Sequence, residues 1–518
     1  MPDRHSTEDT AAQAGATITD LYRPLDEAET NRKHWLTVIT AGMGFFTDAY
    51  DLFIIGTVTV LLTPIFHLST NQISLLNSIS LLASVVGALT FGKLMDRLGR
   101  KRMYGLEILI LAVGAILSAF SWNFTSLFVF RILVGFGVGG DYATSAVITS
   151  EYSNKKSRGK LIGTVFAMQG IGLMAGPAIA SIFLASGVPN GVAWRLMLGL
   201  GAVPALSVVY LRRKIQETPR FSLSVAGDVV AATRAVEWVT GDVQVGGANG
   251  NGNGNGNGNG NGNGNANGNA NGNGNGTGTT HAPVENWTLR KKLTSKPYLL
   301  RLIGTAGSWF LIDIAFYGNS VSSPLILKQL QPHGSLLSHT LISLAIFAVA
   351  AFPGYWMAVW LMDKIGRRRI QWQGFAMMAL AFAAIWLIPG AVKNTGLFLA
   401  LFAISYFFVE FGPNVTTFVL PSEIFPTSIR GMGDGISAGA GKFGAFLGAL
   451  FVPHLLKSIG ISGVMGIMAG VAVAGVILTL IAIPEPMGQS LEEASGEVLI
   501  KPVSLAAAVD GVPAVKAG

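Results

Sequence analysis

The sequence predicts an all-α membrane protein whose twelve transmembrane helices form two pseudo-symmetric six-helix halves. Half of the 518 residues are apolar and only 12% are charged, whereas a soluble domain usually carries about 25% charged residues. The apolar residues lie in long runs, such as 104–122, 341–362 and 461–483, which is typical of a membrane protein. Motifs of the first half also recur in the second, which indicates two repeated units.

Each predicted helix is an apolar run of about 20 residues, the length that crosses the hydrocarbon core of a bilayer. The N-terminal half, 35–212, contains the runs 35–62, 73–95, 103–121, 125–151, 160–186 and 193–212. The C-terminal half, 299–483, contains the runs 299–322, 338–362, 370–390, 396–420, 433–457 and 461–483. Many glycines lie inside these runs, where small residues let membrane helices approach closely.

Polar segments flank the two halves. We expect residues 1–34 to form an N-terminal tail without a cleavable signal peptide, because this segment has no apolar stretch. Residues 484–518 form the C-terminal tail, and residues 213–298 form a linker between the halves. The centre of the linker, 246–276, alternates Asn and Gly, so it has little to bury and we expect a disordered tether.

Basic residues cluster after every second run, and this pattern predicts the orientation. These residues are Lys93, Arg97, Arg100, Lys101 and Arg102, then Lys155, Lys156, Arg158 and Lys160, then Arg212, Arg213 and Lys214, then Lys364, Arg367, Arg368 and Arg369, and finally Arg430. By the positive-inside rule, both tails and the linker are cytoplasmic. We expect a multi-pass protein of the plasma membrane, and the net charge of +8 therefore does not indicate nucleic-acid binding.

The sequence lacks the signals of an enzyme or a metalloprotein. It has no cysteine, which excludes disulfides, thiolate metal sites and a cysteine nucleophile. A phosphate-binding GxxxxGK[ST] loop and a histidine-rich metal spacing are also missing from the sequence. We therefore expect a protein that is not an enzyme and that needs no cofactor or metal.

Two landmarks repeat between the halves. Asp96 to Arg102 (DRLGRKR) follows the second run, and Asp363 to Arg369 (DKIGRRR) follows the eighth, at an offset of 267 residues. In each half a glutamate then precedes an Arg-Gly pair by seven positions, and the two glutamates are 272 residues apart. These residues are Glu151 with Arg158, and Glu423 with Arg430.

The loop after the second run resembles the signature of the major facilitator superfamily, G-x-L-x-D-R-x-G-R-[RK]. The matching residues are Gly92, Leu94, Asp96, Arg97, Gly99, Arg100 and Lys101. A carboxylate at a helix end can meet the positive N-terminus of another helix or an arginine. The resemblance implies the fold of that superfamily. It also implies conformational gating, in which such contacts hold one state of the protein and break in the other. The residues implied in gating are Gly92, Asp96, Arg97, Gly99, Arg100, Glu151, Arg158, Asp363, Gly366, Arg367, Glu423 and Arg430.

A few ionisable residues lie inside the predicted helices, namely Asp48, Asp51, Arg131, Asp141, Asp313, Glu410 and Lys442. Charges are costly in a bilayer, so such residues usually face a partner or a cavity. At about 1.5 Å per residue, Asp313 lies roughly 20 Å from the cytoplasmic start of its helix, near the midplane where transporter sites lie. Trp309, Asp313 and Tyr317 recur every four positions and share one helix face.

Four stretches narrow the resemblance to the phosphate:proton symporters of the superfamily. They are Gly139–Glu151, Phe166–Gly170, Ser308–Tyr317 and Phe411–Phe418. The resemblance implies a phosphate site from Tyr142, Gln169, Trp309, Asp313, Tyr317, Asn414 and Lys442, and a proton path from Asp48, Asp51, Arg131 and Asp141 together with Asp313. The chain departs from the family at Ala143-Thr144, at Gly318-Asn319-Ser320 and at Glu410, where a neutral polar residue is expected.

These features together predict a proton-coupled importer of inorganic phosphate that works by alternating access, as a functional monomer in the lipid bilayer. Phosphate keeps a proton that a carboxylate such as Asp313 can accept in a hydrogen bond, whereas sulfate has none. Two alternatives stay open. One is a proton symporter for another small anion, an organic acid or a sugar or polyol, since residues 423–427 (EIFPT) also resemble those carriers. The other is a nutrient sensor that does not transport.

Overall fold

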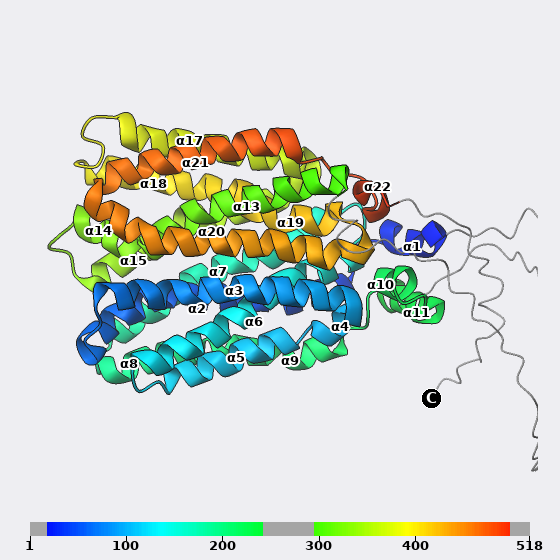
Figure 1. The fold of residues 1–518 in the computed structure, drawn as a ribbon, viewed down its shortest axis with the longest axis horizontal. Helices are drawn as coiled ribbons and strands as arrows, with labels where there is room; N and C mark the ends of the chain where they lie inside the picture. The colour runs from blue at the N-terminus through cyan, green and yellow to red at the C-terminus, as the bar shows by residue number, and fades with distance from the viewer. Residues whose placement is uncertain (1–17, 242–294, 498–518) are drawn as a thin grey trace, which may run out of the picture.

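The computed structural model describes residues 18–241 and 295–497, and every regular element in these ranges is helical (Figure 1). Twelve helical segments of the described residues are long and apolar enough to cross a membrane, and they confirm the predicted fold class. In the first half the segments are α2 (Arg32–Phe66), α3 (Thr70–Leu98), α4 (Arg100–Met103) with α5 (Leu106–Ala119), α6 (Phe124–Tyr152), α7 (Arg158–Ala185), and α8 (Asn190–Leu200) with α9 (Ala202–Lys214).

The second half repeats this arrangement (Figure 1). Its segments are α13 (Lys296–Val321), α15 (Leu336–Ile346) with η1 (Phe347–Ala351) and α16 (Phe352–Ile365), α17 (Arg367–Leu387), α18 (Thr395–Val409) with η2 (Glu410–Asn414) and α19 (Val415–Ile424), η3 (Thr427–Ile429) with α20 (Arg430–Ser458), and α21 (Gly460–Ala482). The short α14 (Ser323–Leu330) joins α13 to α15.

Four short helices lie beyond one end of the bundle, which we call the terminal end (Figure 1). They are α1 (Ile18–Glu27), α10 (Pro219–Ser224), α11 (Val229–Thr240) and α22 (Leu491–Ser495). The sequence analysis treated these segments only as polar tails and linker. The helix α11 buries Ala232, Ala235, Val236 and Val239, one face at helical spacing. The predicted Asn-Gly tether, 246–276, lies outside the described residues.

Glycines bring the helix backbones together at the two interfaces of α20. A Cβ atom on Gly444 would lie 2.2 Å from the carbonyl oxygen of Phe310 in α13. A Cβ atom on Gly92 of α3 would lie 2.5 Å from the carbonyl oxygen of Gly431, so the contact between the halves also runs through backbone. Small residues therefore set how closely α20 approaches its own half and the other half.

The tenth span is broken near its middle. The turn η2 is π-helical, Gly412 within it has φ −108° and ψ −113°, and Pro413 follows. Proline cannot donate the helical hydrogen bond, and a Cβ atom on Gly412 would lie 2.4 Å from the Cα atom of Gly374 in α17. Such breaks are common at functional sites, and this one contains Glu410 and Asn414.

Candidate functional site

A buried polar cluster lies between the two halves, and we call it the central cluster. The first half contributes Tyr142 from α6 and Gln169 from α7. The second half contributes Asp313 and Tyr317 from α13, Tyr355 from α16, Glu410 and Asn414 from η2, and Lys442 from α20. All eight side chains are buried. The sequence analysis had assigned Tyr142, Gln169, Asp313, Tyr317, Asn414 and Lys442 to one substrate site, and the fold brings these six together.

A hydrogen-bonded chain crosses the interface between the halves at this cluster. The amide of Gln169 donates to the hydroxyl of Tyr142 at 3.1 Å, and its carbonyl oxygen accepts from the hydroxyl of Tyr355 at 2.9 Å. The amide of Asn414 then donates to the Tyr355 hydroxyl at 3.1 Å. The hydroxyls of Tyr142 and Tyr317 lie 3.4 Å apart. One glutamine thus connects hydroxyls from both halves.

Lys442 supplies a buried positive charge to this cluster. Its ammonium donates to the hydroxyl of Tyr317 at 2.8 Å and lies 3.9 Å from the centre of the Tyr142 ring. The Asp313 carboxylate is 3.7 Å away, which is an ion-pair distance. Asp313 is therefore paired within the membrane, because Lys442 approaches it from the adjacent α20. Both Asp313 oxygens still lack a hydrogen bond within the described residues.

Glu410 contacts an amide and not a cation. Its Oε2 atom accepts a hydrogen bond of 2.5 Å from Asn414, four residues further along the chain. Its Oε1 atom has no hydrogen-bond partner in the part of the chain that the structure describes. Lys442 does not pair with Glu410, because its ammonium faces Asp313 and Tyr317.

Trp309 packs against the cluster on the side that faces the terminal end. A Cβ atom on Gly441 would lie 2.3 Å from its ring, so the indole rests on the glycine backbone of α20. The ring centre is 6.0 Å from that of Tyr142 and 6.3 Å from that of Phe418. Trp309 is thus part of the predicted face of α13, and its contacts there are packing contacts.

The predicted proton-path residues occupy two places in the first half. Arg131 donates to Asp51 at 2.7 Å. Asp141 accepts from Arg212 at 2.7 Å, and the same guanidinium nitrogen donates to Glu107 at 2.9 Å. Lys442 acts electrostatically on Asp48 as well as on Asp313, and neither Asp48 oxygen has a hydrogen bond to a described residue.

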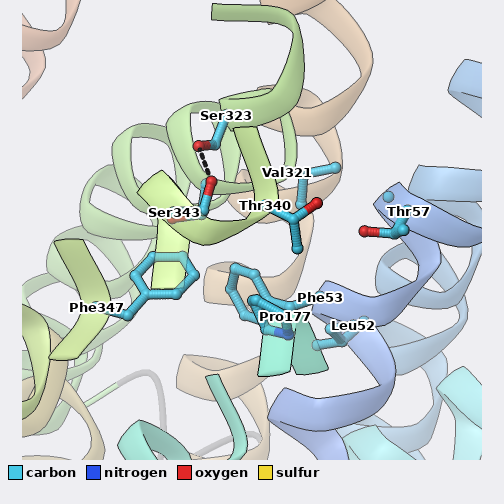
Figure 2. Close-up of a pocket in the computed structure, with 11 residues that line it drawn as sticks. Leu52, Phe53, Thr57, Pro177, Val321, Ser323, Thr340, Ser343 and Phe347 are labelled. Carbon is cyan, nitrogen blue, oxygen red and sulfur yellow. Dashed lines mark hydrogen bonds between the residues drawn. The ribbon is translucent and has the colours of Figure 1, made fainter. Parts of the chain in front are cut away.

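A small pocket is lined by Phe53 of α2 and by Ser320 and Val321 of α13, which follow Tyr317 on the side away from the terminal end. Figure 2 shows part of this lining. The volume of the pocket is about 30 Å³, enough for about two water molecules. Hydroxyl residues and phenylalanines line it, and Ser323 and Ser343 form a hydrogen bond of 3.0 Å there (Figure 2). The ring of Phe53 faces the pocket and lies 6.0 Å from the Tyr317 ring. Phe53 thus separates the pocket from the central cluster.

At the terminal end, ion pairs join the two halves. Glu151 accepts from Arg100 of its own half at 3.1 Å and from Arg430 of the other half at 2.8 Å. The Asp96 carboxylate accepts from the backbone N–H groups of Gly431 at 3.0 Å and Met432 at 2.7 Å. These groups lie at the N-terminus of α20, where a helix favours a negative charge.

The second half repeats these contacts with one difference. Asp363 accepts from the backbone N–H groups of Gly159 at 3.0 Å and Lys160 at 2.7 Å, at the N-terminus of α7. Glu423 pairs with Arg367 of its own half at 2.9 Å. Arg158, the counterpart of Arg430, instead lies 3.5 Å from Asp26 of α1 and donates to the carbonyl of Gln489.

Among the predicted gating residues, the glycines have distinct roles and one arginine lies apart. Gly99 and Gly366 have φ angles of +99° and +100°, a conformation that other residues avoid, and each begins a basic helical turn. Gly92 makes the backbone contact between the halves described above. Arg97 is exposed at this end, and it does not belong to the buried network.

Acidic residues outside the membrane-spanning segments accept further hydrogen bonds at the terminal end. Glu217 accepts from the backbone N–H groups of Arg100 and Lys101, and Glu485 does the same for Arg367 and Arg368. Burial raises the pKa of Glu217. In α22, burial opposes ionisation of Glu492, but the Arg220 guanidinium at 2.8 Å prevails and lowers the pKa of Glu492 to about 2.

Sequence reasoning missed three buried polar residues. Tyr355 looked like an ordinary aromatic in an apolar run, although it lies about 15 Å from the end of α16 at Ile365. Arg212 was interpreted as a loop charge that sets orientation, but its side chain is fully buried because Asp141 and Glu107 neutralise it. Asp434 is buried in α20 near Asp96, and neither of its oxygens has a hydrogen-bond partner among the described residues.

Twelve spans in two repeated halves, with a polar cluster between them and ion pairs across one end, define the architecture of a membrane transporter. The sequence model of the Major Facilitator Superfamily matches residues 41–433, and the chain belongs to this superfamily.

Relatives with known names cover nearly the whole chain. The chain is 36% identical to "Probable inorganic phosphate transporter 1-6" of Arabidopsis thaliana, over 92% of this chain and 96% of that protein. It is 36% identical to "Inorganic phosphate transporter 1-11" of Oryza sativa subsp. japonica, over 91% and 89%. It is 34% identical to "Inorganic phosphate transporter 1-1" of Arabidopsis thaliana, over 92% and 97%.

Solved structures share the fold. The proton:xylose symporter XylE bound to 6-bromo-6-deoxy-D-glucose matches with a TM-score of 0.69 and 20% identity, over 89% of this chain and 98% of that one. A partially occluded inward-open structure of XylE from E. coli matches with a TM-score of 0.65 and 17% identity, over 87% and 100%. At this level of identity, the likeness extends to the architecture alone.

Proposed function

We propose that this protein imports inorganic phosphate together with protons by alternating access. The observation that carries this proposal is the central cluster, in which both halves surround a buried ammonium with hydroxyl and amide donors. The names of the relatives point to phosphate as the anion. The proposed substrate residues are Tyr142, Gln169, Trp309, Asp313, Tyr317, Asn414 and Lys442, to which we add Tyr355.

The donors of the cluster suit a tetrahedral oxyanion. Lys442, the tyrosine hydroxyls and the amides of Gln169 and Asn414 supply hydrogen bonds to the phosphate oxygens, and the bond from Lys442 is charge-assisted. Phosphate at neutral pH keeps at least one hydroxyl, which can donate to the acceptor oxygen that the Asp313 carboxyl group keeps when it is protonated. Sulfate has no such hydroxyl and would leave this buried acceptor without a partner. This supports phosphate over sulfate.

The ion pair between Lys442 and Asp313 supplies a means of coupling proton binding to phosphate binding. When Asp313 binds a proton, the charge of Lys442 becomes available to the anion. Phosphate binding then favours protonation of Asp313, and protonation favours phosphate binding to the same extent. We propose Asp48, Asp51, Arg131 and Asp141 as the remaining proton path.

The contacts at the terminal end suit a gate. We propose that the ion pairs of Glu151 and the helix-end contacts of Asp96 and Asp363 hold this end closed, and that they break when the site opens toward it. The excess of Lys and Arg at this end supports a cytoplasmic location for the tails and the linker. We further propose a plasma-membrane protein that functions as a monomer.

Uptake into proteoliposomes tests this proposal. Labelled phosphate is added with an acidic exterior, and unlabelled arsenate, sulfate or organic acids are added as competitors. We expect acid-stimulated uptake that arsenate blocks and sulfate does not. Stronger competition by an organic acid or a polyol would favour a different symporter, and binding without uptake would favour a sensor.

A further inference from the structure

We propose that Glu410 is an additional proton-binding residue of the central cluster, which must be protonated when the anion binds. Each phosphate would then bring one more proton than Asp313 and Asp48 account for. This inference rests on the proposed function of the cluster. It is carried by the position of Glu410, by its neighbours and by the charge balance of the cluster.

The broken helix directs Glu410 into the cluster. Glu410 opens the π-helical turn η2 and Asn414 closes it, so that both side chains lie on the same side of the break. Asn414 donates to Glu410 at 2.5 Å and to Tyr355 at 3.1 Å, and Tyr355 in turn donates to Gln169. The Glu410 carboxyl group is therefore the end of the same hydrogen-bonded chain that crosses between the halves.

The groups that face Glu410 are neutral or acidic. The adjacent elements are α13, α16, α17, α18 and α19. From them, Asp313 of α13, Tyr355 of α16 and Tyr406 of α18 interact electrostatically with Glu410, while α17 approaches η2 with Gly374. The ammonium of Lys442 is already engaged by Tyr317 and Asp313. An ionised Glu410 would thus be a buried charge without a cation, which is unfavourable.

The charge balance of the cluster also favours a protonated Glu410 when the anion binds. Asp313 and Glu410 of the cluster, together with Asp48, which also acts on Lys442, set three acidic groups against the single charge of Lys442. All four side chains are buried. With the three acids ionised, an incoming anion would enter a site with excess negative charge, and like charges disfavour each other strongly at low dielectric. Protonation removes this repulsion. It also turns the Glu410 carboxyl into a donor, and the Oε1 atom has no partner among the described residues.

Proton counting during phosphate binding tests the inference. The full-length protein in detergent is titrated with inorganic phosphate by calorimetry at a slightly alkaline pH, in buffers of different ionisation enthalpy. The buffer dependence of the heat gives the number of protons taken up. The variants are Glu410→Gln and the smaller amide Glu410→Asn. The control is Asp434→Asn, which removes another buried acid of the bundle roughly 12 Å along α20 from Lys442.

We expect both Glu410 variants to bind phosphate and, at a pH alkaline enough to ionise Glu410 in the empty wild type, to take up as much as one proton fewer than the wild type. The count for Asp434→Asn should be unchanged. Protonation of phosphate itself cancels in this comparison, and either folded Glu410 variant decides the result. A proton count that stays unchanged as the pH is raised would overturn the inference. So would loss of phosphate binding with intact thermal unfolding, since Glu410 would then serve only as the acceptor for Asn414. Failure of the wild type to bind phosphate would instead refute the proposed function.

Discussion

At the scale of single residues, Lys442 dominates the electrostatics of the central cluster. Its ammonium is buried against two tyrosine rings and next to one carboxylate. Hydrogen bonds to charged groups contribute about 1.5–3 kcal/mol each. Every other proposed donor of the cluster is neutral, so the contribution of this side chain is the largest that a single substitution can remove.

We therefore predict that Lys442→Gln weakens phosphate binding by roughly 10- to 100-fold, because it removes one charge-assisted hydrogen bond. Equilibrium binding of labelled phosphate to the purified protein measures this. Lys457→Gln is the matched control, since Lys457 is exposed near the other end of the same helix. An affinity of Lys442→Gln within about twofold of the wild type would contradict the assigned role.

Asp313 is predicted to affect coupling more than binding. Asp313→Asn keeps a hydrogen-bonding group beside Lys442 but cannot gain or lose a proton. We expect this variant to lose at least about tenfold of its acid-driven phosphate uptake, and to retain exchange of internal for external phosphate in the absence of a gradient. Paired uptake and exchange assays in the same vesicles separate the two steps. Accumulation at the wild-type rate would exclude Asp313 from the proton path.

The residues that sequence reasoning identified are those whose chemistry is anomalous in a membrane. Asp313, Lys442 and Asn414 stand out against apolar neighbours, and their depths follow from helix geometry alone. Tyr355 does not stand out, because a tyrosine in an apolar run is common in membrane proteins. Arg212 was misassigned because sequence cannot reveal that Asp141 and Glu107, distant along the chain, neutralise it.

At the scale of elements, the gate that we propose depends on a single acid that faces both halves. Glu151 connects Arg100 of the first half with Arg430 of the second, and all three side chains are buried. Removing one partner from a buried ion pair costs about 3–5 kcal/mol. This cost applies only to the state in which the terminal end is closed, so it changes the balance between conformations.

We predict that Glu151→Gln shifts this balance toward a state that is open at the terminal end, by at least about 100-fold in the equilibrium constant. The chain has no cysteine, so spin labels at Lys101→Cys and Lys364→Cys, which are exposed in different halves, report the distance directly. The matched variant is Glu423→Gln, whose acid pairs within its own half and should shift the balance less. Unchanged label distances in Glu151→Gln would contradict the gate.

The helix α22 offers a test through pH, because its acid has a strongly lowered pKa. Glu492 titrates at about 2 in the folded protein against an ordinary value of 4.5. Its contribution to docking of α22 is therefore complete above about pH 4.5, and it is lost as the pH falls toward 2. We predict that a thiol at Ser495→Cys stays protected from labelling between neutral pH and about pH 5.

The same thiol should become accessible as the pH falls below about 4. In Glu492→Gln, the pair with Arg220 is absent, and labelling should be faster at every pH. Labelling of the otherwise wild-type protein that already rises between pH 7 and 5 would show that another group with an ordinary pKa holds α22 in place.

Element boundaries were predicted well where apolar length determines them. The run 461–483 corresponds to α21 (Gly460–Ala482), and the run 73–95 lies within α3 (Thr70–Leu98). The break at η2 was not predicted, although Gly412 and Pro413 are visible in the sequence, because glycine and proline are tolerated in membrane helices without breaking them. The short α1 and α11 were missed because their apolar faces are narrow within polar segments.

At the scale of the whole molecule, the two halves meet at two places with different chemistry. The terminal end is joined by buried ion pairs and helix-end contacts, whereas the central cluster is joined by the uncharged amide of Gln169 and tyrosine hydroxyls. A substrate that replaces the hydrogen bonds of Gln169 changes the contacts between the halves. In the mechanism that we propose, occupancy of the site and closure of the gate are therefore linked through one interface.

The repeat explains why the overall architecture was predictable and why its asymmetry was not. Two DxxGR loops and two glutamates predict a pair of equivalent gates. In the structure, Arg430 reaches Glu151 across the interface, whereas Arg158 turns to Asp26 of the N-terminal helix α1. This difference depends on α1, which has no counterpart in the described part of the second half.

The most direct test of the central claim is gradient-driven accumulation in proteoliposomes. The exterior is acidic, the membrane voltage is held at zero with potassium and valinomycin, and internal labelled phosphate is measured at steady state. We predict accumulation beyond what ionisation of free phosphate at the two pH values produces, by about tenfold per pH unit for each coupled proton, with collapse on adding a protonophore. Phosphate that only reaches the distribution set by its own ionisation would contradict proton-coupled transport.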